Sequence, residues 1–151
     1  MFHIISLSGP AGRGYPTPEA AAAAFGAHCY AFTRETGREC AASLYAREED
    51  GQTRYWYDNV CIGTSDAVAI YVPWDHWEAD GRTYVGCVHT HPPGGLPRFS
   101  GYDVAAFRRI RDGMPAGSAF YAFLVLREGR LLRFVDAPLR WEEEVEPLAG
   151  V

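Results

Sequence analysis

Two histidines, His89 and His91, stand one residue apart, and an aspartate, Asp103, follows shortly after them. Side chains two residues apart on a strand point to the same face, and Pro92 ends such a strand because it cannot donate to the ladder. Asp103 falls in the first turn of a helix that would begin at Ser100. Two imidazoles and a carboxylate suit Zn²⁺ and leave a fourth position for water, whose pKa the metal lowers to about 7. The sequence therefore predicts one catalytic zinc ion per chain, with His89, His91 and Asp103 as its ligands.

Each part of this pattern also has an explanation that needs no metal. Ser100-Gly-Tyr-Asp103 matches a capping box, in which the serine and the acidic residue satisfy backbone N–H groups at a helix start. A single histidine is commonly a hydrogen-bonded core or surface residue. A pair of histidines on one strand face, ended by proline, favours the metal site over these explanations. Cys87 would share the strand face of His89, so a cysteine ligand is a further alternative.

The four cysteines indicate neither a zinc ribbon nor a disulfide framework. No two of them form a Cys-x-x-Cys pair, and we expect them to be small buried apolar residues. They are Cys29, Cys40, Cys61 and Cys87.

The run His89-Thr-His-Pro92, followed after seven residues by Ser100-Gly-Tyr-Asp103, resembles the signature of the JAMM (MPN+) metalloprotease family. This resemblance implies that the two histidines and the aspartate bind zinc, and that a distant upstream glutamate acts on the zinc water. It also implies that the serine stabilises a tetrahedral oxyanion. Two other segments, Thr17-Pro-Glu-Ala-Ala21 and Asp50–Tyr57, are similar to a compact bacterial branch of the family. The architecture that the resemblance implies is the one shared by JAMM and cytidine-deaminase domains.

Glu39 is the glutamate that best matches the upstream acid of the family. It leads into an apolar strand that could neighbour the histidine strand, and a general base must be held within hydrogen-bond reach of its water. The next residues, Cys40, Ala41 and Ala42, are small but are not the glycines that the family often has there. The alternative for Glu39 is a solvated carboxylate at a strand start. The other candidate acids fall at a helix end, in a turn or in a loop: Glu35, Glu48, Glu49 and Glu78.

Turn signals and hydrophobic periodicity place these residues around one sheet. Thr17-Pro18 opens a helix that Gly37 ends. A second helix is predicted at 100–112, and an apolar run predicts a buried strand at 67–72. The other predicted elements are strands at 2–7, 38–47, 53–57, 82–89, 119–127 and 130–136, loops at 9–18 and 92–99, and an acidic tail at 138–151. This order predicts one domain, 1–151, with an α+β (mixed α/β) fold whose central, mostly antiparallel sheet is flanked by helices.

The composition narrows the classes of partner. The 151 residues carry a net charge of −5 and contain 48% hydrophobic and 22% charged residues, which is typical of one globular domain. There is no Lys/Arg-rich run, so nucleic-acid binding has little support. The apolar stretches are too short to span a bilayer, and the N-terminus lacks the features of a signal peptide. We expect a cytoplasmic protein that binds neither nucleic acid nor membrane; the sequence indicates no oligomeric state.

These features together predict a zinc-dependent peptidase or isopeptidase. The family resemblance implies a protein or peptide substrate, including the C-terminal tail of a ubiquitin-like protein, which could bind in an extended form beside the site. Only 49 residues separate Glu39 from His89 and 48 follow Asp103, which leaves little room for insertions that grip ubiquitin. Two alternatives are an inactive JAMM-like binding scaffold, against which the intact ligand residues argue, and a zinc hydrolase of a small amide.

Overall fold

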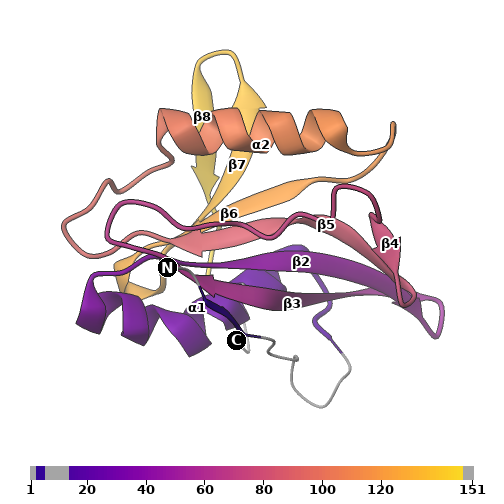
Figure 1. Cartoon of the computed structure of the whole chain (residues 1–151), viewed down its shortest axis with the longest axis horizontal. Helices are drawn as coiled ribbons and strands as arrows, with labels where there is room; N and C mark the ends of the chain where they lie inside the picture. The colour runs from indigo at the N-terminus through magenta and orange to yellow at the C-terminus, as the bar shows by residue number, and fades with distance from the viewer. Residues whose placement is uncertain (1–2, 6–13, 148–151) are drawn as a thin grey trace.

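One sheet runs through the middle of the molecule in the computed structural model, which describes residues 3–5 and 14–147 (Figure 1). Seven strands follow one another in the order β1-β3-β2-β5-β6-β7-β8, and the short β4 pairs with β5 beside this path. Neighbouring strands are antiparallel except β5 and β6, which are parallel. The strands are β1 (His3–Ile5), β2 (Cys40–Glu49), β3 (Gln52–Ile62), β4 (Glu78–Ala79), β5 (Arg82–Thr90), β6 (Tyr121–Val125), β7 (Leu131–Ala137) and β8 (Arg140–Glu144). The predicted α+β fold with a mostly antiparallel sheet is confirmed.

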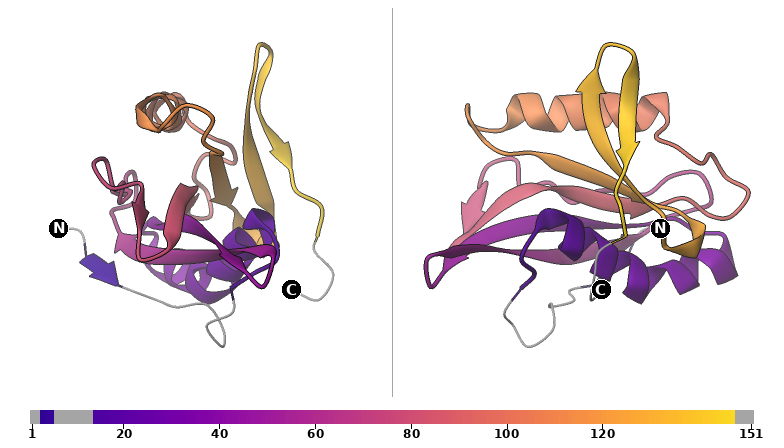
Figure 2. Two further views of the ribbon diagram at one scale, coloured as in Figure 1. Left: turned by 90° about the vertical axis from the view of Figure 1, so that its right-hand side faces the viewer. Right: turned by 180° about the vertical axis from the view of Figure 1, so that it is seen from behind.

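Two helices, α1 (Pro18–Thr36) and α2 (Gly101–Gly113), lie on opposite faces of this sheet (Figure 2). On β5, Val85 and Val88 belong to the core that α1 covers, whereas Cys87 belongs to the core that α2 covers. Both faces of β5 are therefore buried, which explains its nearly continuous apolar sequence. Neither helix within the described residues combines the length and the apolar composition that a membrane span requires.

The ends of α1 follow from its capping residues, as predicted. The Thr17 hydroxyl accepts a hydrogen bond from the Ala20 amide at 3.0 Å, and Pro18 occupies the first turn, where no amide hydrogen is needed. Gly37 ends the helix in the left-handed conformation, with φ of 71°. This stop places Glu39 directly before β2.

The first strand and the first loop were predicted over residues that the structure describes only in part. A strand is present at His3–Ile5, within the predicted 2–7. Residues 6–13, which include half of the predicted loop at 9–18, lie outside the described residues.

The first hairpin is longer than predicted. Its turn, Asp50-Gly51, has positive φ angles of 52° and 79°, as the tight turn of a two-residue hairpin requires. β3 continues to Ile62. Asn59 within it adopts a left-handed conformation, with φ of 55°, where the pairing of β2 with β3 shifts in register. A bulge of this kind places an extra residue in one strand of a pair.

The strand predicted at 67–72 is wrong, because this segment has no regular secondary structure. Both edges of β3 are already paired, with β1 and with β2, so the segment that follows β3 cannot pair with it. Its apolar side chains pack instead on the face that α2 covers: Ile70 against the cluster of Phe99 and Phe107, and Val72 against that of Tyr45. A short apolar run does not distinguish a strand from such a packed segment.

The acidic segment after Pro138 contains a strand that the sequence analysis missed. β8 pairs with β7 at the edge of the sheet, although Arg140-Trp-Glu-Glu-Glu144 lacks the alternation of apolar and polar residues that marks a strand. Ion pairs hold this edge: Arg133 contacts Glu143, and Arg130 lies 2.6 Å from Glu144. The two-residue β4 was also not predicted.

Gly86 permits the close contact of β5 with β6. Its φ is 149°, and a Cβ atom at this position would lie 1.7 Å from the Tyr121 carbonyl oxygen. No side chain fits there unless the two strands move apart.

We therefore expect Gly86→Ala to lower the free energy of unfolding by about 3 kcal/mol or more, because overpacking and an unfavourable φ add up. Urea denaturation followed by circular dichroism measures this. Gly101→Ala is the matched control, since nothing lies within 4 Å of that added methyl group. Equal stability of the two variants would contradict the assignment of this contact.

Candidate metal centre

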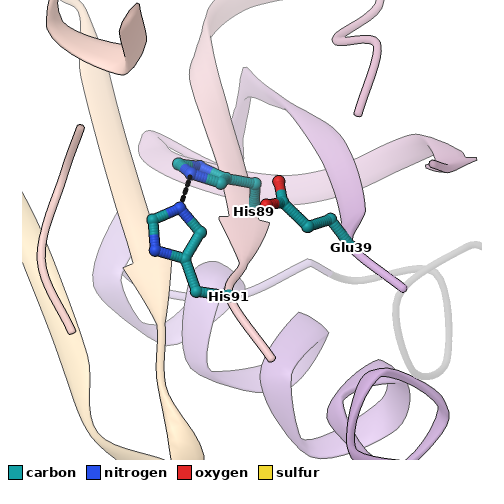
Figure 3. A group of neighbouring side chains, drawn as sticks. All are labelled: Glu39, His89 and His91. Atoms are coloured by element: carbon teal, nitrogen blue, oxygen red, sulfur yellow. Dashed lines mark hydrogen bonds between the residues drawn. The ribbon is translucent and has the colours of Figure 1, made fainter. Parts of the chain in front are cut away.

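The predicted ligands come together where β5 ends and α2 begins. His89 and His91 are buried, with 2% and 6% of their surface exposed, and Glu39 is buried beside them with 8% exposed. Ala41 of β2 pairs with His89 of β5, so the start of one strand meets the end of the other. Figure 3 shows the carboxylate of Glu39 and the two imidazoles gathered on one side of these strands.

The distances among three donor atoms fit one tetrahedral metal ion. The Nε2 atoms of His89 and His91 are 3.2 Å apart (Figure 3), and Oδ2 of Asp103 lies 3.3 and 3.4 Å from them. A tetrahedral ion with ligands at about 2.0–2.1 Å has ligand–ligand edges of about 3.3–3.4 Å. The predicted set of His89, His91 and Asp103 therefore has the spacing of three corners of a tetrahedron.

Glu39 offers a fourth donor. One of its carboxylate oxygens forms a group with the two histidine nitrogens in which all ligand atoms lie within 4.8 Å of one another. The carboxylate would therefore stand beside an ion held by His89, His91 and Asp103. Among the described residues, neither Cys87 nor any other glutamate belongs to this group, although Cys87 is buried on the same strand.

The two imidazoles are oriented by different means. Nδ1 of His91 lies 2.7 Å from the Leu96 carbonyl oxygen, to which it can only donate, so Nε2 of a neutral His91 presents its lone pair to the centre. Nδ1 of His89 is buried without a hydrogen-bond partner in the described part of the chain. Its ring is instead held by packing, with the rings of Phe99 and Phe107 each at 6.1 Å.

Asp103 is both a capping residue and a candidate ligand. The Ser100 hydroxyl accepts from the Asp103 amide at 3.0 Å, and the Ser100 amide donates to Oδ2 of Asp103 at 2.9 Å. This is the capping box that the sequence allowed as the metal-free explanation. The same Oδ2 atom faces both imidazoles, so the cap fixes the carboxylate in the position that a metal ion would need.

The electrostatics of the site favour a cation among these groups. Burial raises the pKa of Glu39, and the imidazoles offset only part of the rise. Burial would also raise the pKa of Asp103, but hydrogen bonds from His89 and His91 hold it far below its usual range. Burial would lower the pKa of His91, yet Asp103 and the Leu96 carbonyl raise it overall. Either protons or a metal ion can meet this demand for positive charge.

An open cleft of about 480 Å³ gives access to the site. It is lined by the segment at 65–70, which overlaps the strand wrongly predicted at 67–72, and by the first turns of α2. These lining residues were not predicted from the sequence, because neither a loop wall nor a backbone carbonyl such as that of Leu96 leaves a signal in residue type or spacing. Besides the site residues, the lining includes Val68, Ile70, Tyr102 and Ala106.

Residues 19–135 match the family model described as prokaryotic homologs of the JAB domain. The chain belongs to this family. The matched region includes Glu39, both histidines, Ser100 and Asp103, and the family indicated by the motif resemblance is confirmed. A comparison with curated proteins gave no match.

In this JAB-family domain kept free of metal with a chelator, the raised pKa of His91 makes the stability depend on pH. The stabilisation that protonated His91 contributes is fully present below its ordinary pKa of 6.5. It is lost as the pH rises through the higher pKa that His91 has in the folded protein. We expect His91→Gln to lower the free energy of unfolding by about 1–3 kcal/mol near pH 6, and by less at pH 9. Urea denaturation of both proteins at each pH tests this; a difference that grew with pH would contradict it.

Proposed function

We propose that this protein is a zinc-dependent hydrolase that cleaves amide bonds in peptides or isopeptides. The observation that carries the proposal is the triangle of donor atoms from His89, His91 and Asp103, with edges of 3.2–3.4 Å, at the base of an open cleft. A buried carboxylate, Glu39, stands next to this triangle. Membership of the JAB family supports the same chemistry.

The donor set favours zinc, one ion per chain. Two imidazoles and one carboxylate form a common catalytic zinc site, in which three protein ligands leave one position open. Zinc in such a site acts as a Lewis acid and lowers the pKa of water to about 7. His89, His91 and Asp103 would hold the ion, because their donor atoms form the triangle of short distances, and Glu39 would stand beside it.

Glu39 is proposed to move the proton. Burial raises the pKa of its carboxyl, which brings the proton affinity closer to that of a base working near neutral pH. Glu39 takes a proton from the attacking water as oxygen adds to the amide carbon, and gives it to the leaving nitrogen when the C–N bond breaks. The products are a carboxylic acid and an amine.

Ser100 is proposed to stabilise the negative charge that develops on the carbonyl oxygen. Its hydroxyl oxygen accepts a hydrogen bond from the Asp103 amide, which orients the side chain. The capping box does not use the proton of this hydroxyl. Because Ser100 also lines the cleft, this proton is available to a substrate oxygen. A preorganised donor of this kind contributes most where charge appears during the reaction.

The substrate is proposed to be an extended protein or peptide segment, including the C-terminal tail of a ubiquitin-like protein. Such a segment would lie between the wall at 65–70 and α2, with Val68 and Ile70 on one side and Tyr102 and Ala106 on the other. We place the reaction in the cytoplasm, without a nucleic-acid or membrane partner. The intact ligands and base argue against the inactive scaffold.

A small amide is the second candidate substrate. The cleft volume of about 480 Å³ lies within the range of about 300–1,000 Å³ that is typical of small-molecule sites. The two candidates differ in what they need beyond the cleft, because a protein tail brings a folded domain that must dock outside it.

The metal is tested first. We expect about one zinc ion per chain in the purified protein, measured by mass spectrometry, and its loss in His89→Ala and in Asp103→Ala, because each removes one of three ligands. Zinc that remained bound in both variants, or a wild-type protein that took up none when zinc was added, would contradict the site.

The role of Glu39 is tested by Glu39→Gln, which keeps the shape of the side chain but cannot accept the proton. We expect this variant to retain its zinc and to lose about 10²–10⁴-fold in kcat. The assay is a panel of peptides, isopeptide-linked conjugates, ubiquitin-like tails and small acyl-amides. Glu35→Gln, at the exposed end of α1, is the control and should match wild type. Full activity of Glu39→Gln would exclude the proposed base.

A further inference from the structure

Next to the metal centre, the backbone pairing of β2 with β5 gives way to a hydrogen bond from backbone to side chain. The last backbone-paired residues of the two strands are Ala41 and His89. One position further, the amide of Cys40 donates to the side-chain hydroxyl of Thr90 at 2.9 Å. A side chain therefore supplies the acceptor at the place where Glu39 separates from the strand pair.

The Thr90 hydroxyl also contacts α1. Its Oγ1 atom lies 2.7 Å from Oγ1 of Thr33, and Thr33 Oγ1 lies 3.6 Å from Sγ of Cys40. One direction of donation satisfies every hydroxyl proton: the Cys40 amide to Thr90, Thr90 to Thr33, and Thr33 to the Cys40 sulfur. These three residues, the hydroxyl chain, are buried with exposures of 2% or less.

The hydroxyl chain connects the residues that carry the site. Thr90 stands between the two histidines, and Cys40 directly follows Glu39. Because neighbouring side chains on a strand point to opposite faces, the hydroxyl chain lies on the face of the sheet that α1 covers, while the imidazoles lie on the face that α2 covers. α1 makes a second contact here, since the Tyr30 hydroxyl donates to the His91 carbonyl at 3.1 Å.

We propose that Thr90, together with Thr33, is a positioning residue that holds the ends of β2 and β5 together and so sets the locations of Glu39 and of the ligand His91. The inference rests on the proposed function for what Glu39 does there, but not for the effect on metal binding. Without the Thr90 hydroxyl, the buried Cys40 amide loses its acceptor, and the strand ends that carry Glu39 and His91 are free to move apart.

The test compares Thr90→Val, which keeps the shape but removes the hydroxyl, with Thr90→Ser, which keeps the hydroxyl. We expect Thr90→Val to bind zinc about 10–100-fold more weakly, the range found for residues that orient metal ligands. We also expect kcat to fall when zinc is saturating while KM stays unchanged, because the substrate walls are not touched. Thr90→Ser should restore both values to near those of wild type.

Two further variants separate positioning from folding. Thr33→Val leaves the acceptor for the Cys40 amide in place and should weaken zinc binding by less than Thr90→Val. Thr53→Val is the control, because its hydroxyl bonds to Glu48 on the exposed hairpin. Zinc affinity is measured by competition with a chelating indicator, well below the melting temperature of each variant. If Thr90→Val is unfolded at that temperature, Thr33→Val decides whether the hydroxyls position the site. A zinc affinity below that of Thr53→Val supports the inference, and an equal affinity overturns it.

A Thr90→Val protein that melts earlier but keeps wild-type zinc affinity and kcat would overturn the inference, since Thr90 would then be only a stabilising core residue. Wild-type protein that binds zinc but cleaves nothing in the substrate panel would overturn the proposed function instead. The zinc affinities of the variants would still decide the inference in that case. A wild-type protein without zinc affinity would overturn both.

Discussion

Antiparallel pairing of β2 with β5 determines which residues meet at the site. With Ala41 opposite His89, Glu39 arrives beside histidines that lie about fifty residues further along the chain. A slip of one residue would turn one set of side chains to the opposite face of the sheet and separate the carboxylate from the imidazoles. Two backbone hydrogen bonds also fix Glu39 from its other side, to Gly63 and Thr64 at 2.8 Å each. The candidate metal centre thus depends on the register of these two strands as well as on the individual side chains.

The Ser-x-x-Asp motif shows that a structural and a chemical explanation of the same residues need not exclude each other. A capping box requires an oxygen atom directed at the start of the helix, and a metal site requires an oxygen atom held still. Asp103 meets both requirements with one carboxylate. Because the cap is made whether or not an ion is present, part of the cost of ordering the ligand is met by folding itself.

Local signals account for what could be predicted from the sequence. The His-x-His pair, the helix start at Ser100 and the caps of α1 are each specified within a few residues, and the structure places them as expected. The choice of Glu39 depended on the family resemblance, since the residues next to it in the sequence do not indicate which side chains it meets in the fold. The segment at 67–72 and β8 were misjudged because their structure depends on which strand edges are already occupied. The contact of Thr33 with Thr90 joins residues far apart in sequence and leaves no periodic trace.

The wall of the cleft at 65–70 is not part of the hydrogen-bonded sheet, and this has a consequence for how such domains can diverge. Fifteen residues, 63–77, connect β3 to β4, and lengthening a flexible connection costs little, about 0.6 kcal/mol for each doubling. Substitutions or insertions at 65–77, beyond the Gly63 and Thr64 that bond to Glu39, would change the width and lining of the cleft without breaking a strand pair. In the proposed hydrolase, substrate preference and catalytic chemistry would therefore be carried by separate parts of the fold, so that one could evolve while the other is kept.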